Sequence, residues 1–303
     1  MKFGLNIPLP LLHGGFQSPE SVKVIAHALD KSRADIGHVT DHPAPDAHWL
    51  HNDPAGHDAL DPFTELAFIA ANTSRLRVQT SVLVLPYRNP FITAKAAATL
   101  HVLSGGRLVL GVGAGYQKGE FEAMGVPFRE RGALTDEALE VIRMAWAGGA
   151  VVKQGRYFDA KGNEPRPALL SPPPIWVGGG SDKAVERAAR WGDGWMPFLT
   201  RPANDPEIDK SSVKTNAELA DKIARLRELR EQFGKSSDFE INVAPHWYPA
   251  DRSRAEIDKY CEQINELKAL GVTSLTAVIR QPNLEAYLDA LAWYDEEIMA
   301  RFD

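Results

Sequence analysis

The stretch SPPPIWVGGGSDKAVERAARWG, residues 171–192, contains a strand and a helix in immediate succession. The apolar residues 175–177 follow three prolines and lead directly into the glycines 178–180. Ser181 then stands where a helix N-cap is expected, because a serine side chain can accept a hydrogen bond from a free N–H group of the first turn. A strand, a glycine-rich turn and a helix together form one βα unit.

The same unit recurs along the whole chain. Segments of strand character alternate with segments of helical character, and no change in composition marks a linker between them. The predicted strands cover residues 2–8, 36–41, 76–86, 107–115, 175–180, 194–198, 239–245 and 274–280. The predicted helices cover residues 18–33, 62–74, 90–106, 131–149, 181–192, 216–234, 253–271 and 283–302.

Eight βα units in one chain predict an α/β fold, a closed parallel (β/α)8 TIM barrel, with residues 1–303 as a single domain. Residues 150–174 break the alternation and predict a hairpin insertion after the fourth unit. A doubly wound open sheet is the alternative fold, but it leaves the eighth unit unexplained.

The composition bears on the class of protein. The 303 residues carry a formal net charge of −6 and no dense basic run, so we expect no nucleic-acid partner. No segment reaches the roughly 20 apolar residues of a membrane span. The single cysteine, Cys261, allows no disulfide framework within the chain, and residues 1–15 predict a strand and loop instead of a signal peptide. We therefore expect a cytoplasmic protein.

The chemistry of a parallel barrel is expected at the carboxyl ends of its strands, in the loops that follow them. Four such segments stand out in the sequence. They are TDHP, SVLVLPYRNP, GVGAGYQKGE and VGGGSD, residues 40–43, 81–90, 111–120 and 177–182. The last two are rich in glycine and open onto helices.

Gly178, Gly179, Gly180 and Ser181 predict a phosphate-binding turn. Glycine lets the backbone approach a ligand closely, and a helix N-terminus presents free N–H groups with partial positive charge. The alternative is a tight turn with Ser181 as its N-cap, for which one glycine would suffice. The GVGAG run, residues 111–115, resembles a dinucleotide fingerprint only superficially, because it follows the fourth strand and lacks the GxGxxG spacing.

Asp41 and His42 are the candidate acid/base pair. They end an apolar strand, where they would face the barrel mouth, and histidine titrates near neutral pH. Side chains of adjacent strand residues point to opposite sides, so both face the site only if the strand has already ended. The alternative is a loop histidine beside a helix-capping aspartate.

A group of histidines raises a metal-site hypothesis. His38, His48, His51 and His57 fall in one region, and His246 follows a later strand. Metal barrels usually take ligands from several strand ends, whereas the segments after strands four, five and six lack histidine. We therefore expect no metal, and a metal-dependent hydrolase is the less favoured reading.

Two long stretches resemble the luciferase-like monooxygenase superfamily of flavin and deazaflavin barrels. They are residues 80–132, TSVLVLPYRNPFITAKAAATLHVLSGGRLVLGVGAGYQKGEFEAMGVPFRERG, and residues 172–195, PPPIWVGGGSDKAVERAARWGDGW. The resemblance covers most of residues 1–200 and continues more loosely to the C-terminus. Within the superfamily the chain is most similar to the group that uses the deazaflavin coenzyme F420.

This resemblance implies roles for the post-strand residues. A cis, non-proline peptide in a bulge of the third strand, at Ser81–Val82, would lie behind the cofactor ring. The backbone around Gly113, Ala114, Gly115 and Tyr116 would flank the cofactor side chain. The turn Gly178–Ser181 would take the phosphate.

Asp41 and His42 match the Asp-His pair of family dehydrogenases, in which the histidine serves as base or proton donor beside the ring. The sugar-phosphate dehydrogenase branch also has a Trp shortly after this His and a Glu after the strand-four glycines. Here the first Trp is Trp49, and Tyr116 stands at the Glu position, so a sugar phosphate is disfavoured as substrate. The loop 43–61 and the aromatic pair at 157–158 are expected to shape the substrate pocket.

The leading hypothesis is therefore an F420-dependent oxidoreductase. It would transfer a hydride between the deazaflavin and a small organic substrate, with His42 handling the proton, Asp41 supporting it and Tyr116 as a second contact. The alternative is an FMN-dependent monooxygenase that receives reduced flavin from a partner reductase. A flavin-binding protein without catalysis is the non-enzyme hypothesis, and the resemblance implies a homodimer.

Overall fold

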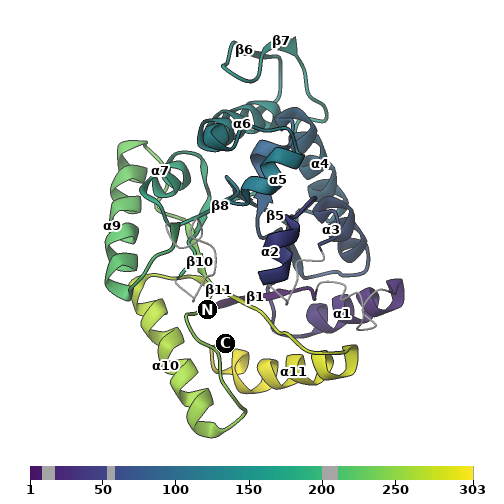
Figure 1. The fold of residues 1–303 in the computed structure, drawn as a ribbon, viewed down its shortest axis with the longest axis vertical. Helices are drawn as coiled ribbons and strands as arrows, with labels where there is room; N and C mark the ends of the chain where they lie inside the picture. The colour runs from purple at the N-terminus through teal and green to yellow at the C-terminus, as the bar shows by residue number, and fades with distance from the viewer. Residues whose placement is uncertain (9–17, 53–58, 200–210, 303) are drawn as a thin grey trace.

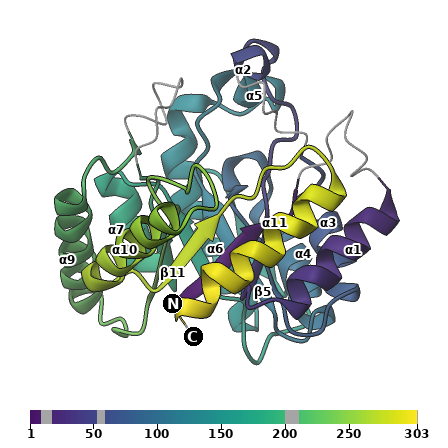
Figure 2. The same cartoon turned by 90° about the horizontal axis from the view of Figure 1, so that it is seen from below.

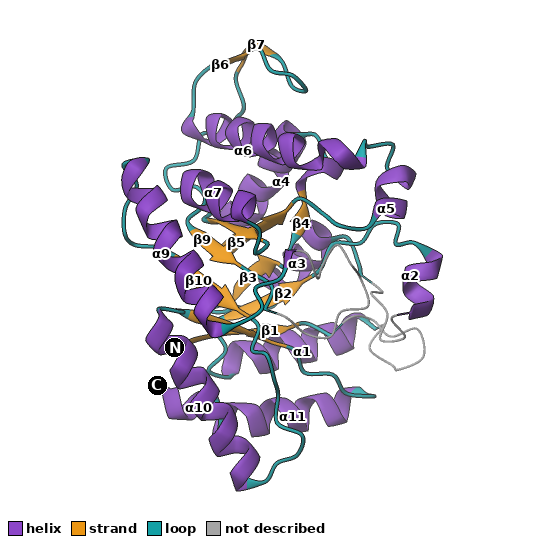
Figure 3. Ribbon diagram, turned by 60° about the vertical axis from the view of Figure 1, so that its left-hand side comes forward, coloured by secondary structure: helices purple, strands orange, loops and turns teal. Residues whose placement is uncertain are grey.

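A computed structural model describes residues 1–8, 18–52, 59–199 and 211–302 of the chain. Parallel strands form a closed ring with helices around it (Figures 1 and 3). The barrel strands pair in the order β1, β2, β3, β5, β8, β9, β10 and β11, and the pairing of β11 with β1 closes the ring, while the short β4 pairs with β5 alone. The predicted (β/α)8 barrel is therefore confirmed.

The elements follow the predicted alternation closely. The strands are β1 (Lys2–Asn6), β2 (Ile36–Val39), β3 (Arg77–Thr80), β4 (Leu83–Val84), β5 (Leu108–Gly113), β6 (Val151–Lys153), β7 (Ala160–Asn163), β8 (Ile175–Gly178), β9 (Gly194–Met196), β10 (Glu240–Val243) and β11 (Ser274–Ala277). The helices are α1 (Pro19–Lys31), α2 (Ala47–Asn52), α3 (Pro62–Ala71), α4 (Pro90–Leu103), α5 (Lys118–Ala123), α6 (Arg131–Ala147), α7 (Asp182–Trp191), α9 (Asn216–Gln232), α10 (Arg254–Leu270) and α11 (Leu284–Glu297). Short 3-10 turns follow at Leu85–Tyr87, Phe128–Glu130 and Met299–Phe302.

Alternation along the strands divides most of the buried apolar residues into two clusters, and Val84, Tyr87 and Phe121 form a third. The main core lies between the barrel and its helices, and it includes Leu5, Val78, Leu110 and Trp195. A small second cluster inside the barrel consists of Ile36, Val109, Trp176 and Met196, with Val82 packed against it.

The third strand is interrupted where a continuous strand over 76–86 was predicted. It runs through β3, passes a cis peptide bond between Ser81 and Val82, and resumes as the short β4. The cis bond is the one that the resemblance implied. The interruption brings the carbonyl oxygen of Thr80 so close to β5 that a Cβ atom at Gly111 would lie 2.0 Å from it.

Each of the three consecutive glycines has a steric reason of its own. A Cβ at Gly178 would lie 3.1 Å from a methyl carbon of Val82. Gly179 has φ of +107°, a region that side-chain-bearing residues rarely adopt. A Cβ at Gly180 would lie 2.6 Å from the carbonyl oxygen of Ser211. The run of glycines is thus explained by packing alone, without a ligand.

The predicted insertion is a hairpin, formed by antiparallel β6 and β7. It projects beyond the outer side of α6 (Figure 1). The backbone N–H groups of Tyr157 and Phe158 donate to the Glu137 carboxylate on α6 at 2.9 to 3.2 Å. The expectation that this aromatic pair shapes the substrate pocket is therefore wrong, because Glu137 ties it to the outside of the helical layer.

Two short helices lie in segments for which only loops were predicted. Helix α2 lies within the loop 43–61, of which residues 53–58 are outside the described residues, and α5 follows β5. The two helices stand side by side (Figure 2). The N–H group of Asp46 donates to the side chain of Gln117 at 3.3 Å, which links the segments that lead into them. Across the described ranges, no helix is long and apolar enough to cross a membrane.

We predict that Gly111→Ala destabilises the protein by at least about 2 kcal/mol, because the new methyl group collides with the backbone of Thr80. Gly132→Ala on α6 is the matched control, since its Cβ meets its nearest atom at 3.6 Å. That control should leave stability unchanged or raise it by up to about 1 kcal/mol. Urea unfolding measures both, and equal stability of the two variants would contradict the close approach.

Candidate functional site

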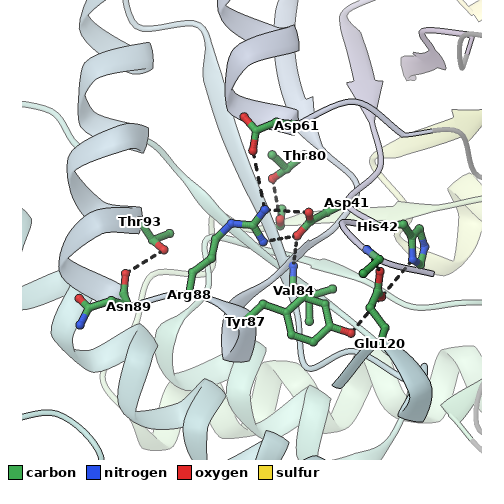
Figure 4. Close-up of polar contacts among 12 residues, drawn as sticks. Asp41, His42, Asp61, Thr80, Val84, Tyr87, Arg88, Asn89, Thr93 and Glu120 are labelled. Carbon is green, nitrogen blue, oxygen red and sulfur yellow. Dashed lines mark hydrogen bonds and ion pairs between the residues drawn. The ribbon is translucent and has the colours of Figure 1, made fainter. Parts of the chain in front are cut away.

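Asp41 lies just beyond the end of β2, where it is buried and fully engaged. Its carboxylate accepts two hydrogen bonds from the Arg88 guanidinium at 2.5 and 2.8 Å and a third from the Val84 N–H group at 2.9 Å (Figure 4). Its side chain is 1% exposed and that of Arg88 is 20% exposed. A bidentate pair of this kind fixes the geometry of both partners.

His42 follows Asp41 but has a different carboxylate as partner. Its Nδ1 lies 3.3 Å from Oε2 of Glu120 and 3.3 Å from the amide nitrogen of Gln117. Asp41 directs its bonds to Arg88 and Val84 instead. The expected support of His42 by Asp41 is thus corrected: the supporting carboxylate is Glu120, which comes from α5, 78 residues along the chain.

Glu120 is buried as deeply as Asp41. Its side chain is 1% exposed. Its carboxylate accepts from the Ala44 N–H group at 3.1 Å and from the Tyr87 hydroxyl at 3.0 Å, in addition to contacting His42. Burial alone raises the pKa of Glu120, but His42, the Ala44 N–H group and the Tyr87 hydroxyl together outweigh it and lower the pKa. Glu120 therefore remains an anion at neutral pH.

Tyr87 lies in the 3-10 turn after β4, and its hydroxyl is the third group in contact with the Glu120 carboxylate. Burial, and then the neighbouring charge and hydrogen bond of Glu120, raise the pKa of Tyr87 well above its usual value. The phenol therefore stays protonated and donates to the carboxylate. Its ring also packs edge-on against Phe121, with ring centres 4.8 Å apart.

Two aromatic side chains surround the imidazole. Trp49 from α2 stacks on His42 with ring centres 5.3 Å apart and planes at 29°. Tyr116 meets His42 edge-on at 6.0 Å and lies 6.3 Å from Trp49. Trp49 is seven positions beyond His42 in the sequence, and α2 brings it back onto the imidazole.

The predicted phosphate turn uses part of its hydrogen-bonding capacity within the protein. The N–H groups of Gly179 and Gly180 donate to the carbonyls of Met196 and Ser211. The side chain of Ser181 caps α7 by accepting from the Ala184 N–H group. The N–H groups of Ala184 and Val185 donate to Ser181, so within the described residues the groups of this first turn left for an anion are the N–H groups of Asp182 and Lys183.

The backbone after β5 is also tightly packed. Gly113 ends β5, and a Cβ there would lie 2.8 Å from Val82. Gly115 has φ of +78°, and its Cβ would meet Val84 and Phe121. Ala114 and Tyr116 lie in the same connection and are partly exposed.

The histidines of the metal hypothesis are scattered. His38 is buried inside the barrel, where burial lowers its pKa to about 4 against the opposing effect of the Ala277 carbonyl. His48 and His51 are exposed on α2, and His57 is outside the described residues. In the ranges that the structure describes, no group of three or more His, Cys, Asp or Glu residues could hold a metal ion.

The fold is a parallel (β/α)8 barrel with the imidazole of His42 at its mouth. Residues 44–298 match the family model of the luciferase-like monooxygenases, and the chain belongs to this family.

Several curated relatives are similar in sequence. The chain is 40% identical over 188 residues to an uncharacterized protein of Mycobacterium tuberculosis, covering 62% of this chain and 60% of that protein. The chain is 31% identical over 245 residues to an F420-dependent glucose-6-phosphate dehydrogenase of Gordonia bronchialis, covering 76% of this chain and 70% of the relative. It is 32% identical over 191 residues to an F420-dependent hydroxymycolic acid dehydrogenase of M. tuberculosis, covering 61% and 51%.

Solved structures share the whole fold at low identity. A monooxygenase, RslO1, from Streptomyces bottropensis superposes with a TM-score of 0.81 at 21% identity, covering all of both chains. An F420-dependent secondary alcohol dehydrogenase with an F420-acetone adduct superposes with a TM-score of 0.77 at 18% identity, covering 100% of this chain and 99% of the other.

We predict that Arg88→Met destabilises the protein by about 3 kcal/mol, because it leaves the carboxylate of Asp41 buried without its counter-charge. Arg254→Met is the control, since that arginine pairs with Asp258 while 74% exposed and such surface pairs contribute less than about 1 kcal/mol. Urea unfolding at neutral pH separates the two effects. A cost for Arg88→Met no larger than that of the control would contradict a structural role for the pair.

Proposed function

We propose that the chain is an F420-dependent oxidoreductase that transfers a hydride between the deazaflavin and a small organic substrate. The observation that carries the proposal is the placement of His42. Its imidazole lies at the barrel mouth with the buried anion Glu120 at Nδ1. Relatives named as F420-dependent dehydrogenases, at 31 and 32% identity, support the choice of cofactor.

The register of the strands brings the proposed site together. Val39 of β2 pairs with Thr80 of β3, so the residues that follow each strand are neighbours. His42 therefore follows one strand while Ser81 and Val82 follow the adjacent one. The N–H bond from Val84 to Asp41 joins the two segments directly.

A planar cofactor ring would lie beside Val82. Strands β5 and β8 carry glycine at positions 113 and 178, where a Cβ would meet the methyl groups of Val82 at 2.8 and 3.1 Å, so at this level the barrel is lined by Val82 and not by a side chain from either position. The cis peptide Ser81–Val82 would lie behind the ring, and the backbone of residues 113–116 would flank the rest of the cofactor. Bound F420 would supply the hydride-carrying carbon, while the protein contributes position and electrostatics.

The phosphate would lie at the turn Gly178–Ser181, against the first turn of α7. The helix N-terminus favours an anion there. Asp182 adds a carboxylate at the same end, and Lys222 opposes its charge through an ion pair at 2.8 Å. The phosphate would therefore bind mainly through backbone N–H groups, with Lys222 offsetting Asp182.

The substrate would be a small neutral molecule with an alcohol or carbonyl group. Trp49 and Tyr116 provide apolar faces next to His42, which suits an uncharged substrate body. Tyr116 replaces the glutamate of the sugar-phosphate branch, which disfavours a sugar phosphate. His42 would accept the substrate proton as the hydride leaves, or return it in the reverse direction. A homodimer remains an expectation from the family resemblance, and a cytoplasmic location remains a prediction from the sequence.

We predict that purified protein binds oxidised F420 at least ten-fold more tightly than FMN, because the family group that it resembles uses the deazaflavin. A fluorescence titration of each cofactor measures this. Tighter binding of FMN would support a monooxygenase that depends on a partner reductase. Failure of both to bind would remove the cofactor assignment and leave only the fold.

We predict that His42→Ala lowers turnover by at least about 100-fold while F420 affinity changes by less than about three-fold, because the imidazole acts on the proton and not on the cofactor. The readout is bleaching of F420 with a panel of small alcohols. His48→Ala, at an exposed position of α2, is the control and should keep full turnover. Unchanged turnover in His42→Ala would exclude it as the proton carrier.

A further inference from the structure

We infer that Asp46 is a positioning residue of the site: docked against Gly119, it holds helix α2 so that Trp49 stacks on His42 and limits the size of the substrate. The position of Trp49 follows from contacts within the protein and can be tested without cofactor or substrate. The limit on substrate size rests on the proposed function.

Asp46 is the N-cap of α2, which begins directly after it. Its carbonyl accepts from the Leu50 N–H group at 3.0 Å. Its Oδ1 accepts from the N–H groups of His48 and Trp49 at 2.9 and 3.2 Å. A capping aspartate binds N–H groups that have no acceptor within the helix. The placement of Asp46 therefore sets where α2 starts and where the backbone of Trp49 lies.

Two contacts dock this cap onto the start of α5, which lies beside α2 (Figure 2). The Asp46 N–H group donates to Oε1 of the buried Gln117 at 3.3 Å. The Asp46 side chain also lies directly against Gly119. The amide nitrogen of Gln117 is in turn 3.3 Å from Nδ1 of His42. One side chain thus contacts both the cap of α2 and the imidazole, which fixes their relative positions.

Gly119 is the residue that permits this docking. A Cβ there would lie 2.6 Å from Oδ2 of Asp46, 3.0 Å from its Cβ and 3.1 Å from its Cγ. The Asp46 carboxylate cannot rotate away without leaving the cap, and its Cβ moves only with the backbone. Gly119 belongs to α5 and has no positive φ, so its own backbone would accept alanine. Glycine is therefore required at this position by Asp46 and not by the conformation of α5.

The docked helix places Trp49 at the proposed proton carrier. Its indole stacks on His42 with ring centres 5.3 Å apart and planes at 29°, and Tyr116 lies 6.3 Å from it. Trp49 is thus an apolar wall beside the imidazole. A substrate that reaches His42 has to fit beside this wall, so the position of α2 sets how large the substrate can be.

Gly119→Ala should displace α2, because the new methyl group would enter the space of the Asp46 side chain. Helix α5 itself should persist, since alanine is a better helix former than glycine. Asp46→Gly removes all three atoms that the methyl group would meet, and it keeps the N–H group that donates to Gln117. The matched control is Gly132→Ala on α6, where a Cβ would lie 3.6 Å from its nearest atom.

The decisive measurement is a 1H–13C NMR spectrum of the His42 ring C–H groups in protein without cofactor. A stacked indole shifts these protons upfield; their signals are assigned by their loss in His42→Ala, and Trp49→Leu gives their positions without the stack. We expect Gly119→Ala to move them toward the Trp49→Leu positions, and Gly132→Ala to leave them unchanged. Asp46→Gly should move them as well, since it loses the cap, and adding Gly119→Ala to it should cause no further change.

Three results would overturn the inference. Identical His42 signals in the wild type and Trp49→Leu would mean that the two rings are not stacked, and this result does not depend on whether Gly119→Ala folds. Unchanged signals in folded Gly119→Ala or in Asp46→Gly would remove the positioning role. An equal shift from Gly119→Ala with and without the Asp46 side chain would show that the methyl group acts elsewhere.

Steady-state kinetics with F420 test the limit on substrate size. Gly119→Ala should lower the ratio of kcat/KM for isopropanol to that for a long-chain secondary alcohol by at least about ten-fold, mainly through KM, because the chemistry at the imidazole is retained. Gly132→Ala should keep the wild-type ratio. If the NMR shifts are as expected but F420 is not turned over with any alcohol, the proposed function fails and the positioning of Trp49 stands. If turnover occurs and the ratio is unchanged, the size limit fails.

Discussion

The geometry of the barrel mouth depends on the carboxylate of Asp41. Beyond the interruption of the third strand, the N–H group of Val84 donates a hydrogen bond to this carboxylate. The same carboxylate binds both guanidinium nitrogens of Arg88, which follows the 3-10 turn. The Asp41 side chain thus joins the end of β2 to Val84, before the 3-10 turn, and to Arg88, after it. His42 and Tyr87 are adjacent to these two anchors, so their positions are set by this interaction.

The two carboxylates of the site have separate tasks because their charges are balanced differently. The charge of Asp41 is neutralised by Arg88, so little of it remains to act on the imidazole. Glu120 has no Arg or Lys partner among the described residues and is bound instead by two neutral donors, the Ala44 N–H group and the Tyr87 hydroxyl. Its negative charge therefore remains available to stabilise an imidazolium at His42.

Local patterns were sufficient to predict the fold and part of the site. Strand and helix alternation, the Ser181 cap and the cis bond implied by family resemblance all depend on residues close in sequence, and the structure contains each of them. Glu120 lies in the segment after the fourth predicted strand, yet nothing in the local sequence connects it to His42. Their contact depends on how α5 packs against the segment after β2, which is a tertiary effect that single-sequence periodicity does not encode.

The glycines illustrate the limit of composition as an argument for function. A tight turn into a helix needs only one glycine. The two additional glycines were therefore interpreted as a phosphate-binding turn. In the structure each is needed for packing: beside Val82, for a positive φ, and against Ser211. Phosphate binding therefore gains no support from their number, and it depends on the free N–H groups at the start of α7. Glycine is required both where a side chain would clash and where a ligand must approach the backbone closely. The sequence alone does not distinguish these two reasons, whereas the surrounding structure does.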